Sequence, residues 1–369
     1  MKIIADKNIP YLKGIAEKFG EVTYLEGAAF TREAIQEADT LIVRTVTRFD
    51  ESNLKDTNVE LICSATIGYD HIDTVYCDAH GIAWRNAPGC NSGSVMQYII
   101  SSLIVMSRKK DFDLRGNTIG IVGVGNVGKK VARACRILGM NVLLNDPPRQ
   151  AVEKNDSFVT LDVIKKEADI ITFHSPLIKD GKYKTYHLAD DNFFSSLKKK
   201  PIIINSARGG IVDTVAIKSA LKTGQISGAI IDCWENEPFI DLEYLNMVDI
   251  ATPHIAGYSA DGKANATRMS LESIAEFYGF SKEPVKEVKE PLAPYPLIYL
   301  DIFNGSDNRI YDAILESYNP VNDFARLKHA PDTFKDLRNK YPLRREYFAY
   351  EVINAFQEER NTLDSLGFH

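Results

Sequence analysis

A glycine-rich turn near the middle of the chain has the spacing that binding of a pyrophosphate requires. Gly123, Gly125 and Gly128 form a G-x-G-x-x-G run that follows an apolar stretch and leads into a helix-like segment. The first glycine permits a tight turn, and the second lets backbone amides approach the phosphates. The third lets the helix pack closely on the strand, so that its positive end faces the anion. This context predicts a dinucleotide-binding turn.

An acidic residue, Asp146, ends the next apolar stretch after this turn. A carboxylate at that position accepts hydrogen bonds from the adenosine ribose and repels a 2′-phosphate, so NAD is favoured over NADP. Two alternatives remain open. Asp146 can be an ordinary turn residue before Pro147 and Pro148, and the nearby Arg149 can accommodate the extra phosphate of NADP.

Three polar side chains at the ends of later apolar stretches have the types that oxidation of a 2-hydroxy acid requires. They are Arg208 in N-S-A-R-G-G, Glu237 in D-C-W-E-N-E-P and His254 in P-H-I-A-G. Arginine offers a planar fork to a carboxylate, and histidine can take the hydroxyl proton. A carboxylate beside the imidazole fixes its tautomer. Each also has an ordinary alternative, namely a surface arginine, a solvated acid or a loop histidine, but their order behind the glycine turn favours catalysis.

Alternating apolar and helix-like segments must position these residues. Residues 1–90 alternate short apolar runs with polar segments, which is typical of βαβ units and a parallel sheet. A mostly apolar helix is predicted around residues 91–109. The alternation starts again at Thr118 and predicts a second parallel sheet, so we expect an α/β fold.

The character of the chain changes beyond about Lys282, where K-E-P-V-K-E-V-K-E-P-L-A-P-Y-P predicts a linker. The remaining residues predict a third, small α/β domain. We expect helices in it at Asp307–Ser317, Asp332–Asn339 and Arg344–Phe356.

Composition excludes several classes of protein. A chain of 369 residues is too long for one ordinary core. The net charge of -6 argues against a nucleic-acid partner. The five cysteines contain no C-x-x-C pair, so we expect neither disulfides nor a metal site. Apolar stretches such as Tyr98–Met106 are too short to span a membrane, and the start lacks a secretory signal, so we expect a cytoplasmic location.

Together, I-G-I-V-G-V-G-N-V-G, N-S-A-R-G-G-I-V-D, D-C-W-E-N-E-P and P-H-I-A-G-Y resemble the D-2-hydroxyacid dehydrogenase family. Four further runs resemble one branch of it that acts on a small phosphorylated 2-hydroxy acid. They are A-P-G-C-N (87–91), L-L-N-D-P-P-R (143–149), D-G-K-Y-K-T-Y-H-L (180–188) and Y-P-L-R-R-E (341–346).

The resemblance implies two doubly wound parallel-sheet (Rossmann-like) domains and a small C-terminal α/β dimerisation domain. The substrate-binding domain would comprise residues 1–92 with a return segment at 257–281. Residues 93–256 would bind NAD. Residues 282–369 would form a homodimer.

The resemblance also implies a set of site residues. Arg208, Glu237 and His254 become the catalytic trio. Substrate contacts fall on Thr45, Thr66 and Tyr258, with the adjacent Arg44 as a candidate for the substrate phosphate. Thr45 stands where serine is expected, and Ser206-Ala207 where Ala-Cys is expected. The cofactor contacts, glycine turn included, are Gly123, Gly125, Asn126, Val127, Gly128, Asp146, Ser175, Ser206, Ala207, Arg208, Asp232 and Gly257.

Two rival functions stay open at this point. One is oxidation of another 2-hydroxy acid, such as 3-phosphoglycerate or D-lactate. The other is a non-enzymatic NAD sensor or corepressor built on the same fold, since a fold does not fix a function. Retention of all three catalytic residue types counts against the second rival.

Overall fold

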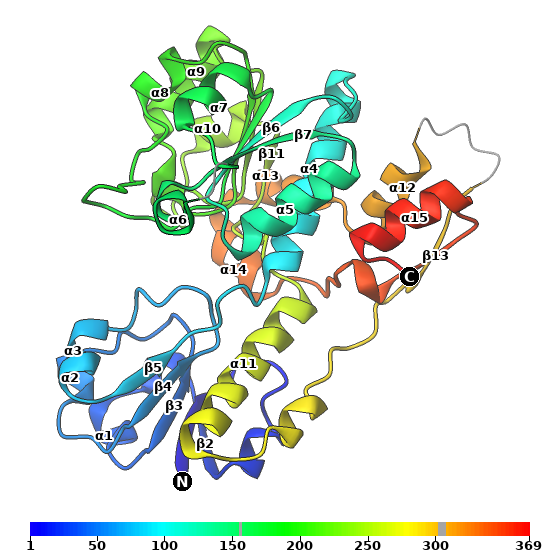
Figure 1. Ribbon diagram of the computed structural model, residues 1–369. Helices are drawn as coiled ribbons and strands as arrows, with labels where there is room; N and C mark the ends of the chain where they lie inside the picture. The colour runs from blue at the N-terminus through cyan, green and yellow to red at the C-terminus, as the bar shows by residue number, and fades with distance from the viewer. Residues whose placement is uncertain (155–156, 302–307) are drawn as a thin grey trace. The chain divides into compact units, whose positions relative to one another are not determined.

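The computed structural model describes residues 1–154, 157–301 and 308–369 (Figure 1). The chain divides into two compact units, each with its own parallel sheet. The first unit comprises residues 1–91 and 259–292, and the second comprises 92–258 and 293–369. Asp307, where one C-terminal helix was expected to begin, lies outside the described residues.

The first unit is a five-stranded parallel sheet in the order β2-β1-β3-β4-β5. Alternate residues of its strands face opposite cores, as the period of a strand dictates. Ile42 and Leu61 pack with Leu271 of helix α11, whereas Leu41 and Ile62 pack on the other side of the sheet. The strands are β1 (Lys2–Asp6), β2 (Glu21–Leu25), β3 (Thr40–Val43), β4 (Leu61–Ser64) and β5 (Ala83–Arg85). The helices are α1 (Arg32–Ile35), α2 (Glu51–Leu54), α3 (Thr74–Ala79) and α11 (Ala260–Tyr278), with 3-10 turns at Ala16–Lys18, Gly27–Ala29 and Glu283–Glu287.

The second unit contains a six-stranded parallel sheet in the order β11-β10-β9-β8-β6-β7. The chain leaves β7 and crosses to β8 on the opposite side of β6. The carboxyl ends of β6 and β8 therefore form the switch point where such sheets bind ligands. The strands are β6 (Thr118–Val122), β7 (Asn141–Asn145), β8 (Ile170–Phe173), β9 (Ile202–Asn205), β10 (Gly228–Ile231) and β11 (Ile250–Ala251). The helices are α4 (Ser92–Lys110), α5 (Asn126–Ile137), α6 (Pro147–Glu153), α7 (Leu161–Glu167), α8 (Asp191–Ser195), α9 (Thr214–Thr223) and α10 (Leu242–Met247), with a 3-10 turn at Gly209–Ile211.

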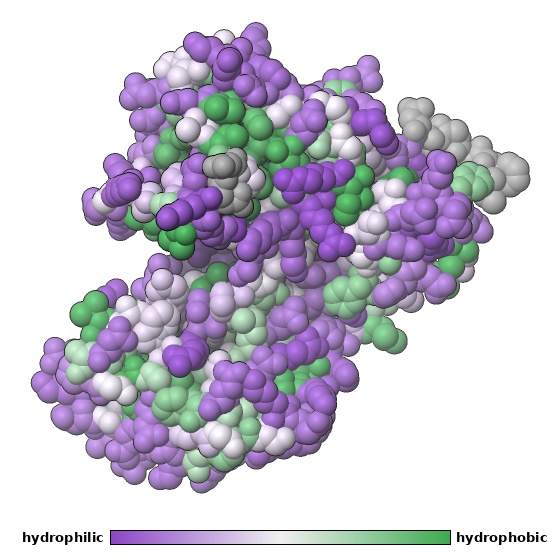
Figure 2. Space-filling view, viewed as in Figure 1, coloured by the Kyte–Doolittle hydropathy of each residue, from purple (hydrophilic) through white to green (hydrophobic). Residues whose placement is uncertain are grey.

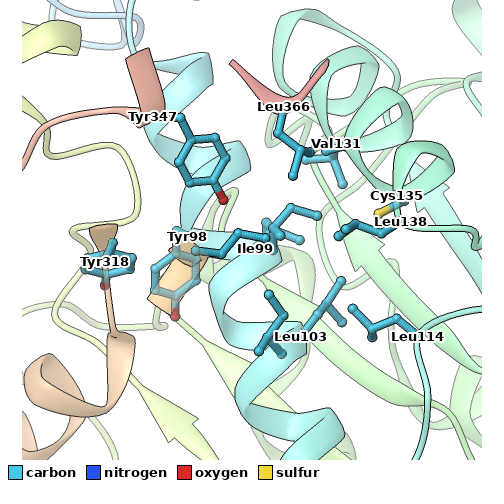
Figure 3. Packing of buried hydrophobic residues seen from close by; sticks show 14 of the residues in the cluster. Tyr98, Ile99, Leu103, Leu114, Val131, Cys135, Leu138, Tyr318, Tyr347 and Leu366 are labelled. Carbon is cyan, nitrogen blue, oxygen red and sulfur yellow. The ribbon is translucent and has the colours of Figure 1, made fainter. Parts of the chain in front are cut away.

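The C-terminal segment packs into the core of this second unit. Figure 3 shows Tyr98 of α4 beside Tyr318, and Leu366 beside Val131 of α5. Segments about 200 residues apart in the sequence thus share one apolar core. The elements of this segment are α12 (Arg309–Ser317), α13 (Pro320–His329), α14 (Phe334–Asn339), α15 (Gln357–Leu366) and the parallel pair β12 (Leu297–Tyr299) and β13 (Glu351–Ile353), with 3-10 turns at Pro331–Thr333 and Tyr347–Ala349.

One C-terminal expectation is wrong. Residues 344–356 do not form a helix, because they contain a 3-10 turn and strand β13. Val352 is fully buried between the less buried Glu351 and Ile353, which is the alternation of a strand. Pairing with β12 outweighs the local helical tendency of this segment.

The two parallel sheets with alternating helices confirm the predicted α/β, Rossmann-like fold class. All five cysteines are buried. Hydrophilic side chains cover most of the face shown in Figure 2, as expected when the apolar runs of the sequence build cores. In the ranges that the structure describes, no helix is both long and apolar enough to cross a lipid bilayer.

Candidate active site

The glycine turn lies between β6 and α5, at the switch point of the second sheet. Gly123 has a φ of +92°, and a Cβ there would lie 2.5 Å from the backbone nitrogen of Ser175. A Cβ on Gly128 would lie 2.1 Å from the carbonyl oxygen of Gly123. Packing therefore excludes side chains at both positions. A Cβ on Gly125 would meet nothing within 4 Å, so this part of the turn is open to a ligand.

Two hydroxyl groups near this turn fit a cofactor rich in hydrogen-bonding groups. Ser175 follows β8 and Ser206 follows β9, and the Oγ atoms of both are buried without a hydrogen-bond partner in the described part of the chain. Such unsatisfied buried groups are rare in folded proteins. With the open Gly125 and the amino end of α5, they form the donor and acceptor set that a dinucleotide needs.

Asp146 lies at the carboxyl end of β7 and is tied to the glycine turn. One of its carboxylate oxygens accepts a hydrogen bond from Val124 N at 2.9 Å. The other accepts one from Arg149 N at 3.1 Å and caps helix α6. The carboxylate therefore has a fixed position beside the turn, as the preference for NAD requires.

The alternative role of Arg149 is not favoured by its contacts. Its guanidinium forms a two-bonded ion pair with Glu153, at 2.7 and 2.8 Å, and donates to Val124 O. It also lies 5.1 Å from the centre of the Phe158 ring. The Arg149 guanidinium is therefore already paired with Glu153 and Val124 O.

This arrangement predicts how cofactor preference can be changed. In an Asp146→Ser, Glu153→Gln double variant, the repulsive carboxylate is lost and the Arg149 charge is released. We expect the ratio of kcat/KM for NAD to that for NADP to fall about 10- to 100-fold, equivalent to roughly 1.4 to 2.8 kcal/mol. Steady-state kinetics with both cofactors measure this ratio, with Glu153→Gln alone as the matched control. An unchanged ratio in the double variant would contradict the assignment of Asp146.

Glu237 and His254 form a hydrogen-bonded pair in the loops that follow β10 and β11. His254 Nδ1 lies 2.8 Å from Glu237 Oε2, and Glu237 Oε1 accepts a hydrogen bond from Trp234 N at 2.8 Å. Burial raises the pKa of Glu237, but the hydrogen bond and charge of His254, with the charge of Arg338, hold it below its usual value. An ionised Glu237 orients the ring with its proton on Nδ1, which leaves Nε2 free to accept a proton.

The backbone of His254 has a φ of +56°, a conformation that residues other than glycine rarely adopt. Asp232 stabilises it. The buried Asp232 carboxylate accepts hydrogen bonds from Thr252 Oγ1, Ile255 N and Ala256 N at 2.6, 2.7 and 3.0 Å. Burial raises the pKa of Asp232, and these bonds oppose the increase. Asp232 thus holds the histidine loop, and its contact with the cofactor stays a prediction.

Arg208 follows β9, the strand next to β10 in the sheet. Its Nη1 donates to Ala207 O at 2.8 Å, and the neighbouring Gly209 backbone packs directly against Trp234. The thiol of Cys233 lies within 4.8 Å of ligand atoms of both Glu237 and His254. Burial and the charges of Asp232 and Glu237 raise the pKa of this thiol well above its usual value, while Arg208 and Arg338 act in the opposite direction. Glu237 and His254 therefore lie around one buried sulfur atom, and the place of the Arg208 side chain in this group stays a prediction.

The predicted substrate residues fall in both units. In the first unit, Arg44 follows β3 and forms an ion pair with the buried Asp6 at 2.9 Å. Thr45 is exposed, and Thr66 donates a hydrogen bond to Gly68 O at 2.9 Å. In the second unit, Tyr258 follows the histidine loop directly after Gly257, which is a predicted cofactor contact. Their roles in binding stay predictions.

Two arginines of the C-terminal segment were missed as site residues. Arg344 is buried and donates to the carbonyl oxygens of Ser94, Ile255 and Ala256 at 2.6, 3.3 and 2.7 Å. It therefore supports the loop that carries His254. Arg338 lies 3.9 Å from Glu237 Oε2. Arg344 belongs to the Y-P-L-R-R-E run, so the sequence contained a signal of family likeness but none of a role.

Known proteins resemble this chain over nearly its whole length. Residues 101–256 match the family described as D-isomer specific 2-hydroxyacid dehydrogenase, NAD binding domain, and residues 293–367 match a domain of unknown function. The erythronate-4-phosphate dehydrogenase of Bacteroides thetaiotaomicron is 53% identical to this chain, and the match covers 96% of this chain and 99% of the relative. That of Porphyromonas gingivalis is 43% identical over the full length of both.

A solved structure shows the same fold with a cofactor. The NAD-bound 3-phosphoglycerate dehydrogenase of Entamoeba histolytica is 26% identical to this chain, and its structure matches with a TM-score of 0.64. The match covers 77% of this chain and 97% of the solved chain. Both resemblances inferred from the motifs, the broad and the narrow, are thus confirmed, as is NAD as the cofactor.

Proposed function

Because the chain belongs to the erythronate-4-phosphate dehydrogenase family, we propose that it oxidises the C2 hydroxyl of 4-phospho-D-erythronate with NAD. The product is 2-oxo-3-hydroxy-4-phosphobutanoate. The observation that carries this proposal is the hydrogen bond between His254 and Glu237, with Arg208 and the glycine turn in the same unit. This is the set of groups that oxidation of a 2-hydroxy acid needs.

The residues of the chain have separate tasks in this reaction. His254 Nε2 accepts the proton of the C2 hydroxyl while the C2–H bond breaks and the carbonyl forms. Glu237 stabilises the resulting imidazolium through Nδ1. Arg208 binds the substrate carboxylate with two parallel hydrogen bonds and polarises the forming carbonyl. NAD, when bound, accepts the hydride, so that the two electrons and the proton are accounted for.

We also propose roles for the parts of the chain. Residues 1–92 with 257–281 bind the substrate, through Arg44, Thr45, Thr66 and Tyr258. Residues 93–256 bind NAD. Residues 282–369 form a homodimer, and the reaction belongs to vitamin B6 biosynthesis in the cytoplasm. The support for these assignments is the likeness to the family, and for the first two parts also the separate parallel sheets of residues 1–91 and 92–258.

A panel of 2-hydroxy acids tests the proposal. The purified protein is mixed with NAD and 4-phospho-D-erythronate, 3-phospho-D-glycerate or D-lactate, and NADH absorbance is followed. We expect the highest kcat/KM with 4-phospho-D-erythronate. A higher value with another acid would assign that substrate instead. Formation of no NADH with any of them would favour the sensor or corepressor.

A further inference from the structure

The C-terminal segment places a positive charge beside the histidine and glutamate pair. Arg338 lies on α14, in the part of the chain that matches a domain of unknown function. Its Nη1 is 3.9 Å from Glu237 Oε2, and its guanidinium carbon is 5.6 Å from the centre of the Tyr258 ring. A segment without an assigned activity thus reaches the candidate active site.

Arg338 is poorly satisfied where it lies. Its Nε is buried and has no hydrogen-bond partner in residues 1–154, 157–301 and 308–369. The distance of 3.9 Å to Glu237 is longer than a hydrogen bond. A guanidinium offers five N–H donors in a planar fork, and buried donors left unpaired are unfavourable. The side chain therefore has donors available for an anionic ligand.

Glu237 does not need Arg338 as its main partner. Its two carboxylate oxygens already accept hydrogen bonds from Trp234 N and from His254 Nδ1. The charge of Arg338 lowers the pKa of Glu237 further, in addition to these two bonded partners. The position of Arg338 is therefore better explained by a group that binds from outside the chain.

The substrate has two anionic groups, and the candidate site has two arginines. If the proposed function holds, the substrate carries a carboxylate at one end and a phosphate at the other. Arg338 lies 3.9 Å from the glutamate that holds the proposed base, and Arg208 follows strand β9 of the same unit. We infer that Arg338 binds the phosphate of the substrate while Arg208 binds the carboxylate. The C-terminal segment then determines substrate specificity.

Paired substrates with and without the phosphate test this inference. In Arg338→Met, we expect KM for 4-phospho-D-erythronate to rise about 10- to 100-fold. The kcat/KM for D-erythronate, which lacks the phosphate, should change less than about threefold. Arg338→Lys keeps the charge without the fork, so its KM should lie between those of the wild type and Arg338→Met. Unchanged thermal unfolding shows that each variant is folded.

A binding measurement gives a readout apart from turnover. With NADH in place of NAD, 4-phospho-D-erythronate binds without being oxidised, and calorimetry measures its affinity. We expect Arg338→Met to weaken this affinity about as much as it raises KM. An equal loss of kcat with both substrates and unchanged affinity would overturn the inference, because Arg338 would then act through Glu237. It would also be overturned if Arg44→Met, and not Arg338→Met, caused the phosphate-dependent loss.

Failure of the proposed function would look different. The wild type would then not oxidise 4-phospho-D-erythronate at all. Inorganic phosphate can still be titrated into the NADH-loaded wild type and Arg338→Met. Weaker phosphate binding by the variant would support Arg338 as an anion-binding residue, and equal binding would reject it.

Discussion

Replacing Arg208 with alanine is expected to lower kcat/KM for 4-phospho-D-erythronate by about 10²- to 10⁴-fold, with little change in the affinity for NAD. Two hydrogen bonds from a guanidinium to a carboxylate contribute roughly 1.5 to 3 kcal/mol each, and each 1.4 kcal/mol is about a factor of ten. The Arg208 side chain bonds only to the neighbouring Ala207 O among the described residues. Its loss should therefore leave the surrounding fold intact.

Steady-state kinetics measure the loss, and quenching of tryptophan fluorescence by NAD measures cofactor affinity. Arg208→Lys is the matched control, because lysine keeps the charge without the planar fork and should recover only part of the activity. Turnover of the alanine variant at the wild-type rate would exclude Arg208 from the reaction. A parallel loss of NAD affinity would instead assign the side chain to the cofactor.

The parts of the site that could be predicted are those that depend on nearby residues. The glycine turn needs only a strand, three glycines and a helix, and all lie within residues 118–137. Arg208, Glu237 and His254 each follow a recognisable apolar strand. Because the strands are parallel and neighbouring, their carboxyl ends meet at one edge of the sheet.

The supporting contacts could not be predicted because they join distant segments. The bonds from Arg344 to Ile255 and Ala256 span nearly 90 residues, and no periodicity in the sequence indicates them. Asp232 was predicted only as a cofactor contact, because its three hydrogen bonds to the histidine loop require the registry of β10 and β11. Strand β13 was missed for the same reason, since its partner β12 lies about 50 residues earlier.

Two separate residues, Arg149 and Glu237, show how local sequence information can also mislead. The charge of Arg149, taken alone, predicts a contact with a 2′-phosphate. Its partner Glu153 lies four residues later, which is the spacing of ion pairs on a helix. The sequence around Glu237 alone is also typical of a solvated acid, whereas in the fold the side chain is largely enclosed and bonded through both oxygens.

Replacing His254 with alanine is expected to lower kcat by about 10²- to 10⁴-fold, the usual contribution of a positioned general base. Glu237→Gln should lower kcat less, because the imidazole remains but loses the charge that stabilises its protonated form. The double variant should be no slower than His254→Ala alone, since the two residues act as a unit. Single-turnover measurements of NADH formation separate this loss from product release.

The hydrogen bond between Glu237 and His254 also predicts that the stability of the fold depends on pH. The pKa of Glu237 is below its usual value of 4.5, so the folded state favours the ionised carboxylate. The resulting stabilisation is present above that usual value and is lost as the pH falls through the lower folded value. Glu237→Gln should therefore reduce the thermal unfolding midpoint at about pH 7, and this difference should shrink toward about pH 3. If the difference in midpoint between the wild type and Glu237→Gln stayed constant across this range, the pairing with His254 would not depend on the charge of Glu237. The charge of Glu237 would then not be what orients the imidazole of His254.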